Sequence, residues 1–202
     1  TELMEDNKVI INFNGVESAF ALWINGDFVG YSEDSFTPSE FDITDYIVDG
    51  KNKVALQVYR FSSGSWLEDQ DFYRFSGIFR DVELKVIPKA HLEDLAVRTD
   101  LNETYDKTNI TVKAKLETRI DNYKVTFQLK DGDTVISTKV ADTDDIEFTV
   151  QLDNPKLWSA EVPNLYQLFI QIEDEKGLVE VVKQNVGVRE FKLKDGIMCI
   201  NG

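Results

Sequence analysis

The sequence predicts an all-β protein, and three observations indicate this class. Apolar residues alternate with polar ones along many short runs, which is the period of a strand with one buried face. Turn pairs such as Asn25-Gly26, Asp131-Gly132 and Lys176-Gly177 separate these runs. Helix signals are few: one helical turn is predicted over residues 44–47, with Thr44 as its cap. The 202 residues suffice for one large or two small domains.

The first third of the chain contains several predicted strands. Residues 9–13 are largely apolar on both faces, so this strand is expected to be buried on both sides. Asn25-Gly26 supplies two positive-φ residues for a tight hairpin between the runs 20–24 and 28–31. The run 54–58 alternates again and completes this group.

The stretch from Gly64 to Val82 combines carboxylates with aromatic rings. Its polar centre is Glu68, Asp69, Gln70 and Asp71, and its flanking aromatics are Trp66, Phe72, Tyr73 and Phe75. Aromatic faces stack on the C–H face of a sugar, and carboxylates accept hydrogen bonds from its hydroxyls. A strand is predicted next, with one face formed by Ile78, Arg80, Val82, Leu84 and Val86. This pattern indicates a polar-aromatic binding loop at a sheet edge, with a solvated acidic turn as the alternative.

A second group of strands follows a predicted domain junction at Pro88-Lys89-Ala90-His91. Proline cannot donate to a strand ladder, so the first pattern ends there, and His91 is expected to be a solvent-facing connector. Apolar alternation resumes in the runs 110–116, 125–129, 146–152, 166–172 and 179–182. Their spacing predicts an immunoglobulin-like sandwich of about seven strands, from Leu92 to about Phe191.

Charge and composition exclude several classes of function. The formal charge of −15 makes nucleic acid and anionic membrane surfaces poor partners, and no apolar run is long enough to span a bilayer. Cys199 and His91 are the single cysteine and histidine, which excludes an internal disulfide and a Cys/His zinc site. The acidic clusters at 131–133 and 142–145 lack the spacing of a calcium-binding EF-hand loop and indicate hairpin tips.

Three blocks, in order along the chain, resemble the large β-galactosidases of glycoside hydrolase family 2. They are residues 14–42 (Asn14-Gly15-Val16 to Pro38-Ser39-Glu40-Phe41-Asp42), 63–82 (Leu67-Glu68-Asp69-Gln70-Asp71 and Ser76-Gly77-Ile78-Phe79-Arg80-Asp81-Val82) and 154–166 (Asn154-Pro155-Lys156-Leu157-Trp158 to Leu165-Tyr166). The resemblance is closer to these enzymes than to the β-glucuronidases of the family, which lack the acidic run.

The resemblance implies a division of the chain into three parts. Residues 1–88 would be the C-terminal part of a sugar-binding jelly-roll domain, a galactose-binding-like sandwich. Residues 89–192 would be the immunoglobulin-like β-sandwich. Residues 193–202 would be the truncated start of a catalytic (β/α)₈ barrel. Asn201-Gly202 has the sequence of a hairpin turn with no strand after it, so the chain is expected to be cut within a hairpin. The chain is therefore expected to be a fragment, with earlier jelly-roll strands, one carrying a sugar-contacting Asn, missing before Thr1.

The resemblance also implies a function: hydrolysis of terminal β-D-galactose in lactose and other β-galactosides, with retention. Both catalytic glutamates would lie on the barrel, so the fragment contains no catalytic residue and is expected to be inactive alone. Asp71 is the one site residue carried over, and it would bind galactose hydroxyls and help to ligate sodium. Phe72-Tyr73 stands where the family usually has Met-Trp. The alternative for Asp71 is an ion pair with Arg74 or Arg80.

Further expectations concern partners and cofactors. The partners would be the β-galactoside substrate and the barrel of the same chain, in a homo-oligomeric cytoplasmic parent enzyme. Sodium would bind at Asp71 and magnesium elsewhere in the parent, with no cofactor certain in these residues alone. Two other functions remain open: an autonomous carbohydrate-binding module, and a structural scaffold between domains.

Overall fold

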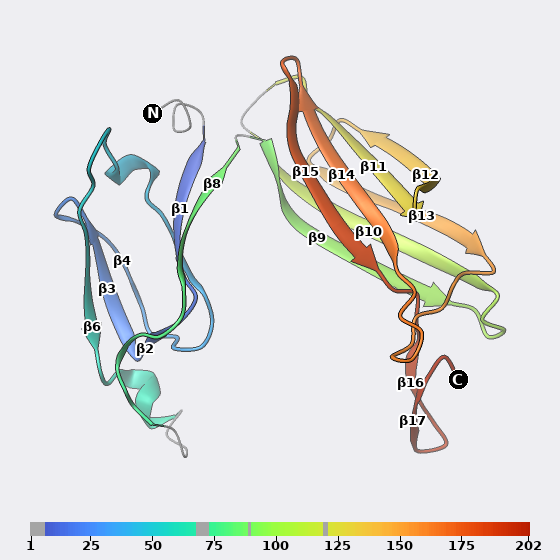
Figure 1. The fold of residues 1–202 in the computed structure, drawn as a ribbon, viewed down its shortest axis with the longest axis horizontal. Helices are drawn as coiled ribbons and strands as arrows, with labels where there is room; N and C mark the ends of the chain where they lie inside the picture. Colours follow the sequence, from blue (N-terminus) through green and yellow to red (C-terminus); the bar gives the residue numbers. More distant parts are fainter. Residues whose placement is uncertain (1–6, 68–72, 89, 119–120) are drawn as a thin grey trace. The chain divides into compact units, whose positions relative to one another are not determined.

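Strands dominate the computed structural model, which describes residues 7–67, 73–88, 90–118 and 121–202 (Figure 1). The chain forms two compact units, unit 1 (Thr1–Pro88) and unit 2 (Lys89–Gly202). The helical elements within the described ranges are two 3₁₀ turns, η1 (Thr44–Tyr46) and η2 (Ser63–Trp66). The predicted all-β class is confirmed. None of the helices in these ranges could span a membrane.

Unit 1 contains, in its described residues, two three-stranded antiparallel sheets. One has the order β5-β1-β8, with the bounds Ser39–Asp42, Lys8–Phe13 and Val82–Ile87. The other has the order β4-β3-β6, with the bounds Asp27–Ser32, Ala19–Ile24 and Val54–Tyr59. A short ladder pairs β2 (Val16–Glu17) with β7 (Gly77–Ile78). This ladder ties the start of the chain to the region after the acidic run.

The core of unit 1 is formed by alternate residues of β1 and β3. Ile11, Phe13, Phe20 and Leu22 are each at most 3% exposed, and the rings of Phe13 and Phe20 lie 5.0 Å apart. The predicted hairpin between β3 and β4 is confirmed, because Asn25 and Gly26 have φ values of 55° and 101°. Two-residue turns with positive φ match the twist of the strands that they join.

The predicted helical turn at residues 44–47 is present as η1, but the predicted cap is wrong. No side-chain cap hydrogen bond is formed at the N-terminus of η1, where the capping position is Ile43. The Thr44 hydroxyl instead accepts a hydrogen bond of 2.9 Å from the N–H of Val9 and donates one to the Asp42 carboxylate. Thr44 therefore joins η1 to β1.

The prediction of one continuous strand after the acidic run is wrong. β7 ends at Ile78, and β8 begins only at Val82. Between them, the Arg80 guanidinium donates hydrogen bonds to the carbonyls of Asn14 and Phe36, and residues 79–81 belong to neither strand. From Val82 onward the predicted face is in register, since Leu84 pairs with Ile11. Yet Leu84 is 67% exposed, whereas Ile11 is 3% exposed.

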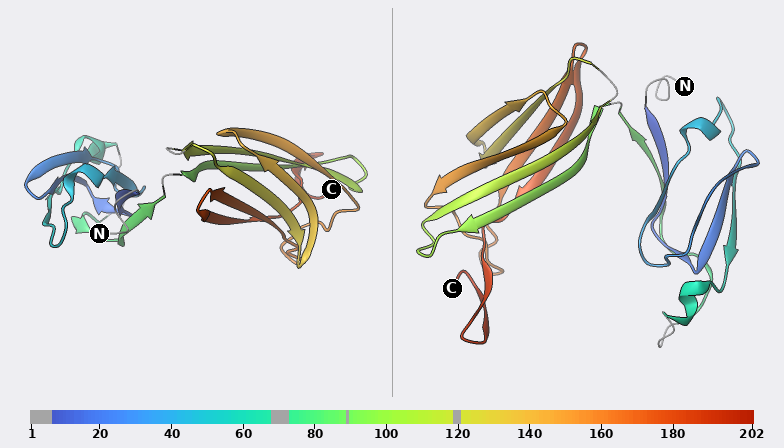
Figure 2. Two further views of the ribbon diagram at one scale, coloured as in Figure 1. Left: turned by 90° about the horizontal axis from the view of Figure 1, so that it is seen from above. Right: turned by 180° about the vertical axis from the view of Figure 1, so that it is seen from behind.

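Unit 2 is a sandwich of a three-stranded and a four-stranded antiparallel sheet, counted in its described residues (Figures 1 and 2). The first sheet has the order β13-β10-β9, with the bounds Asp145–Asp153, Lys107–Thr118 and Ala90–Leu101. The second has the order β12-β11-β14-β15, with the bounds Thr134–Ala141, Lys124–Asp131, Tyr166–Asp174 and Gly177–Val186. These strands confirm the predicted seven-stranded immunoglobulin-like sandwich.

The expectation for His91 is wrong, because β9 already begins at Ala90. His91 is 9% exposed and lies opposite Glu117 of β10, with its Nε2 3.7 Å from Glu117 Oε2. The pairing of β9 with β10 shifts next to Glu93, which lies between residues that pair with Lys115 and Leu116. This bulge changes which residues face inward and hides the strand from a pattern of strict alternation.

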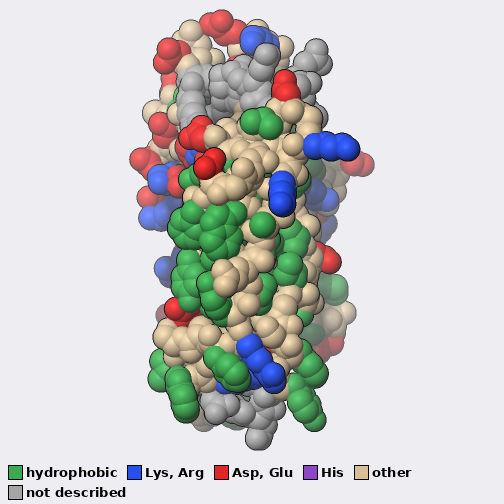
Figure 3. Space-filling view, turned by 90° about the vertical axis from the view of Figure 1, so that its left-hand side faces the viewer, with side chains coloured by type: hydrophobic (Ala, Val, Ile, Leu, Met, Phe, Trp, Pro, Cys, Tyr) green, Lys and Arg blue, Asp and Glu red, His purple; other side chains and the backbone are tan. Residues whose placement is uncertain are grey.

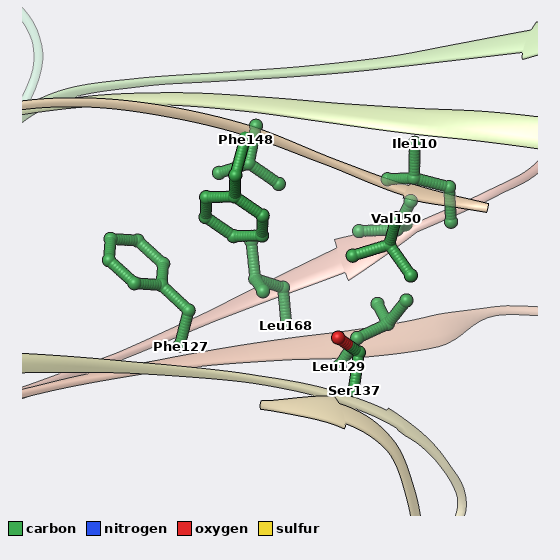
Figure 4. A pocket seen from close by; sticks show the side chains of 9 residues that line it. Ile110, Phe127, Leu129, Ser137, Phe148, Val150 and Leu168 are labelled. Atoms are coloured by element: carbon green, nitrogen blue, oxygen red, sulfur yellow. The ribbon is translucent and has the colours of Figure 1, made fainter. Parts of the chain in front are cut away.

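The core of unit 2 is closed by the side chains of its own two sheets. Phe127 and Phe148 meet edge to face with ring centroids 5.2 Å apart, and Leu168 is 1% exposed (Figure 4). The cavity that these side chains line together with Ile110, Leu129, Ser137 and Val150 has a volume of about 10 Å³. A space of this size holds at most one water molecule, so no sugar fits there.

A hairpin of β16 (Phe191–Lys194) and β17 (Ile197–Ile200) follows the sandwich within unit 2 (Figure 1). Asn201 fastens its base, because its side chain donates to the Trp158 carbonyl and accepts from the N–H of Glu190. The apolar side chains of the hairpin are largely exposed, for example Phe191 at 62% and Met198 at 73%.

Candidate functional site

Asp71, the site residue predicted from the sequence, lies outside the described residues, as do Glu68, Asp69, Gln70 and Phe72. The structure therefore describes this site through the two chain segments that flank the acidic run. The first flank is η2 with Leu67, and the second runs from Tyr73 to Ile78. What holds these flanks determines where the acidic run begins and ends.

The first flank is anchored by a cluster of three serine hydroxyls. Ser18 Oγ lies 2.7 Å from Ser62 Oγ and 3.1 Å from Ser65 Oγ, and the N–H of Ser62 donates to Ser65 Oγ at 2.8 Å. Ser18 and Ser65 are 2% and 5% exposed, so these hydrogen bonds are shielded from water. Buried hydroxyls are expensive to leave unpaired, which favours this one arrangement of η2.

Glu33 provides a second anchor for the same flank. Its carboxylate accepts hydrogen bonds from the hydroxyls of Ser63 and Tyr31, the latter at 2.9 Å. These two bonds, that from Ser63 first, hold the pKa of the Glu33 carboxyl below its usual value. Hydrogen bonding favours the charged form of a carboxylate, so Glu33 is ionised at neutral pH.

The second flank is anchored by Glu17 and connected to the first by Arg74. Glu17 Oε2 accepts hydrogen bonds from the N–H groups of Phe75 at 3.0 Å and Ser76 at 3.3 Å. Arg74 Nη2 donates to the Ser65 carbonyl at 2.6 Å, which brings the two flanks together. Both ends of the segment between Trp66 and Tyr73 are thus fixed to one another and to residues 17 and 18.

These flanks carry exposed aromatic rings. Trp66, Tyr73 and Phe75 are each more than 80% exposed, and the rings of Tyr73 and Phe75 stack at 5.4 Å with an angle of 27° between their planes. Large apolar side chains this exposed usually mark a surface that another molecule or another part of the protein contacts. The described aromatic residues of the predicted polar-aromatic loop are therefore presented to solvent.

A second aromatic group covers the outer face of the β4-β3-β6 sheet, the face of unit 1 on which Figure 3 shows hydrophobic side chains gathered. Its members pair edge to face, Trp23 with Phe28 at 5.6 Å and Tyr31 with Tyr59 at 6.4 Å. Because the Tyr31 hydroxyl donates to Glu33, this face is connected to η2.

Arg80, one of the two cations considered as a partner for Asp71, contacts several described residues of unit 1. Its guanidinium lies 5.3 Å from the Phe79 ring and 6.0 Å from the Phe36 ring, and it donates to the Phe36 carbonyl at 2.8 Å. Gly15 makes room for this arrangement, since a Cβ there would lie 2.9 Å from Arg80 Cδ and Phe79 Cζ.

Sequence reasoning identified the acidic run but missed Glu17, Ser18 and Glu33. The available signal was the polar pair Glu17-Ser18 inside an otherwise apolar run from Val16 to Ile24. Such a pair in a strand region needs local partners, although the sequence does not say which. Within the described ranges, no three His, Cys, Asp or Glu side chains come together as a metal site.

Comparisons with known proteins assign both units to one family. Unit 1 matches the model of "Glycosyl hydrolases family 2, sugar binding domain" over residues 1–88, and unit 2 matches the model "Glycosyl hydrolases family 2" over residues 90–189. A β-galactosidase of Clostridium acetobutylicum is 47% identical over 98% of this chain, and one of Halalkalibacterium halodurans is 48% identical over 98%. The chain spans only 22% and 20% of these relatives.

Solved structures share the fold at lower sequence identity. A β-glycosidase from Bacteroides vulgatus has a TM-score of 0.83 and 25% identity, with 100% of this chain and 26% of that chain covered. An FMN-binding β-glucuronidase from Facaelibacterium prausnitzii L2-6 has a TM-score of 0.85 and 22% identity, with 98% and 32% covered. Together, the two matched models and the fold show that the chain belongs to glycosyl hydrolase family 2.

Proposed function

We propose that these 202 residues serve a retaining β-galactosidase that releases terminal β-D-galactose from lactose and other β-galactosides. The observation that carries this proposal is the 47–48% identity, over 98% of the chain, to two proteins named β-galactosidase. Identity at this level to relatives with one printed activity favours that activity over others of the family. Because the chain spans about a fifth of those relatives, the activity belongs to the longer protein.

In this proposal the chemistry is performed outside these residues. A retaining glycosidase needs two carboxyl groups about 5–5.5 Å apart, one as acid/base and one as nucleophile. On the family resemblance, we infer that both lie on a barrel that follows the second sandwich. Unit 2 then acts as a rigid support, and unit 1 contributes the acidic run to the substrate. The 202 residues alone are expected to release no galactose.

The substrate contact assigned to unit 1 is the Asp71 carboxylate. Carboxylates accept strong hydrogen bonds from sugar hydroxyls, and exposed rings such as Trp66 and Tyr73 suit the C–H face of a sugar. The fixed flanks support this role, because a contact that favours the transition state needs a defined position. A carboxylate is also a hard oxygen ligand of the kind that suits sodium, which Asp71 would help to ligate.

The experiment is the Asp71→Ala substitution in the full-length enzyme, assayed on lactose. We expect kcat/KM to fall by at least about 100-fold, because an unpaired sugar hydroxyl in a site built to bind it is strongly unfavourable. Glu40→Ala is the matched control: it removes a carboxylate of the same unit that is ion-paired with Lys85, and it should leave kcat/KM nearly unchanged. Near-normal turnover of Asp71→Ala would reject the role of Asp71.

The exposed aromatics also favour a second candidate, an autonomous carbohydrate-binding module. Trp66, Tyr73 and Phe75 present ring faces that could bind sugar without any barrel. Calorimetric titration of the 202-residue chain with galactose and with lactose separates the two candidates. Heat of binding saturating at millimolar sugar would support the module, whereas the β-galactosidase proposal expects weak or no binding by this chain alone.

A further inference from the structure

Two consecutive residues hold the two ends of the acidic segment. Ser18 contacts the first flank through the hydroxyls of Ser62 and Ser65, and Glu17 contacts the second flank through the N–H groups of Phe75 and Ser76. Each contact joins residues that are more than 40 positions apart in the sequence, so both contacts depend on the tertiary fold. We propose that Glu17 is a positioning residue for galactoside binding, which fixes the segment that carries Asp71. This inference rests on the proposed function.

The geometry at Ser76 explains why a side-chain acceptor is needed at residue 17. Ser76 and Gly77 have φ values of 66° and 116°, so the backbone turns sharply where the second flank enters β7. The turn directs the N–H groups of Phe75 and Ser76 toward one acceptor, the Oε2 atom of Glu17. A charged acceptor makes such bonds about twice as strong as a neutral one. A non-glycine residue at positive φ requires support of this kind from its surroundings.

Arg74 extends this support to the first flank. It directly precedes Phe75, and its guanidinium donates to the Ser65 carbonyl at 2.6 Å. Moving the backbone of Phe75 and Ser76 therefore moves Arg74 and loosens the contact between the flanks. Phe75 follows Asp71 by four residues, at most about 14 Å of extended chain. A misplacement of about 1 Å at a substrate contact costs about 100-fold in rate.

Amide hydrogen exchange on the 202-residue chain tests the structural half of the inference without any substrate. Glu17→Ala should speed exchange at Phe75 and Ser76 by about tenfold or more, because both N–H groups lose their acceptor. Glu17→Gln keeps an acceptor oxygen of the same shape and should exchange within about threefold of the unchanged chain. Unchanged exchange at both amides in Glu17→Ala would overturn the inference.

A double-mutant cycle in the full-length enzyme tests the functional half. Glu17→Ala alone should lower kcat/KM on lactose by about 10- to 100-fold, and Glu17→Gln should restore most of that loss. If Glu17 acts through Asp71, adding Glu17→Ala to Asp71→Ala should lower kcat/KM by less than about threefold further. A role in folding alone would give the same loss in both backgrounds.

The outcomes separate the two proposals. An equal loss from Glu17→Ala in both backgrounds, with Asp71→Ala itself strongly impaired, overturns the positioning role and leaves the proposed function standing. Full activity of Asp71→Ala overturns the role of Asp71 and, with it, the inference. A loss that is confined to the background with Asp71, together with faster exchange at Phe75 and Ser76, supports both.

Discussion

The two units differ in how they treat the apolar faces of their strands. In unit 2, Ile170 and Ile172 of β14 are completely buried by the opposing sheet. In unit 1, Leu84 of β8 is 67% exposed, although it is in register with the buried Ile11. The same alternation thus produces a closed face in β14 of unit 2 and an open apolar face in β8 of unit 1.

The flanks of the acidic segment lie in unit 1. Their aromatic rings Trp66, Tyr73 and Phe75 are the most exposed of the described rings. Polar anchors, rather than a core, hold these flanks in place. Exposed rings on a polar frame are typical of a surface that binds a ligand or another part of a protein.

The largest expected effect on stability is in the closed core of unit 2. Phe127 is 1% exposed and packs against Phe148, so Phe127→Ala should lower the free energy of unfolding of unit 2 by about 3–5 kcal/mol. Urea unfolding followed by the fluorescence of Trp158, the one tryptophan of unit 2, measures this loss. A loss below about 1 kcal/mol would show that the core is looser than described.

A smaller effect is expected at the close packing of Gly15 in unit 1. Gly15→Ala places a Cβ 2.9 Å from Arg80 Cδ and Phe79 Cζ, and overpacking of this kind costs about 1–3 kcal/mol. Unfolding of unit 1 is followed by Trp23 fluorescence after Trp66 and Trp158 are replaced by Phe. The double variant Gly15→Ala/Phe79→Ala should be more stable than the sum of the single losses predicts, and strict additivity would contradict the contact.

The open face of β8 should respond least to substitution. Leu84→Ser should change the free energy of unfolding of unit 1 by less than about 1 kcal/mol, because the side chain is already largely in water. Ile11→Ser is the matched control, since Ile11 pairs with Leu84 on the same face and is buried. Equal losses at the two positions would contradict the open face of β8.

A last prediction concerns the titration of one tyrosine hydroxyl in unit 2. Burial, and then the hydrogen bond of its hydroxyl to Asp144, raises the pKa of Tyr123 to about 12. The folded state thus holds this proton more tightly than the unfolded chain, so the stabilisation is complete below pH 10 and is lost as the pH rises from 10 toward 12. Absorbance titration should show a phenol near pH 12 that Tyr123→Phe removes, and titration near pH 10 would contradict the contact.

Much of unit 2 could be predicted from its sequence, because the alternation within each strand indicates which residues face the core. The alternation through Ile110 and Val112, for example, predicts a strand of the sandwich core, and both residues are buried. The strand β9 could not be predicted as readily, because the bulge at Glu93 changes the phase of its pattern. His91 was not predicted as a strand residue because Pro88, three residues earlier, indicates the end of a strand pattern.

The sequence indicated the type of the candidate site but not the residues that hold its flanks. The mixture of carboxylates and aromatics between Gly64 and Val82 indicated a polar-aromatic loop, and the described aromatics there are exposed. The anchors Glu17 and Glu33 contact this region from 58 and 30 residues away. Contacts over such separations depend on how the sheets fold, and no local pattern encodes them. The interruption between β7 and β8 likewise depends on the contacts of Arg80 with Asn14 and Phe36.

The most direct test of the account is the distance from the Asp71 carboxylate to galactose in a crystal structure of the full-length enzyme with the sugar bound. We expect a carboxylate oxygen of Asp71 within about 3 Å of a galactose hydroxyl, in hydrogen-bond range. A structure in which Asp71 instead forms an ion pair inside unit 1, with its carboxylate directed away from the sugar, would contradict the account.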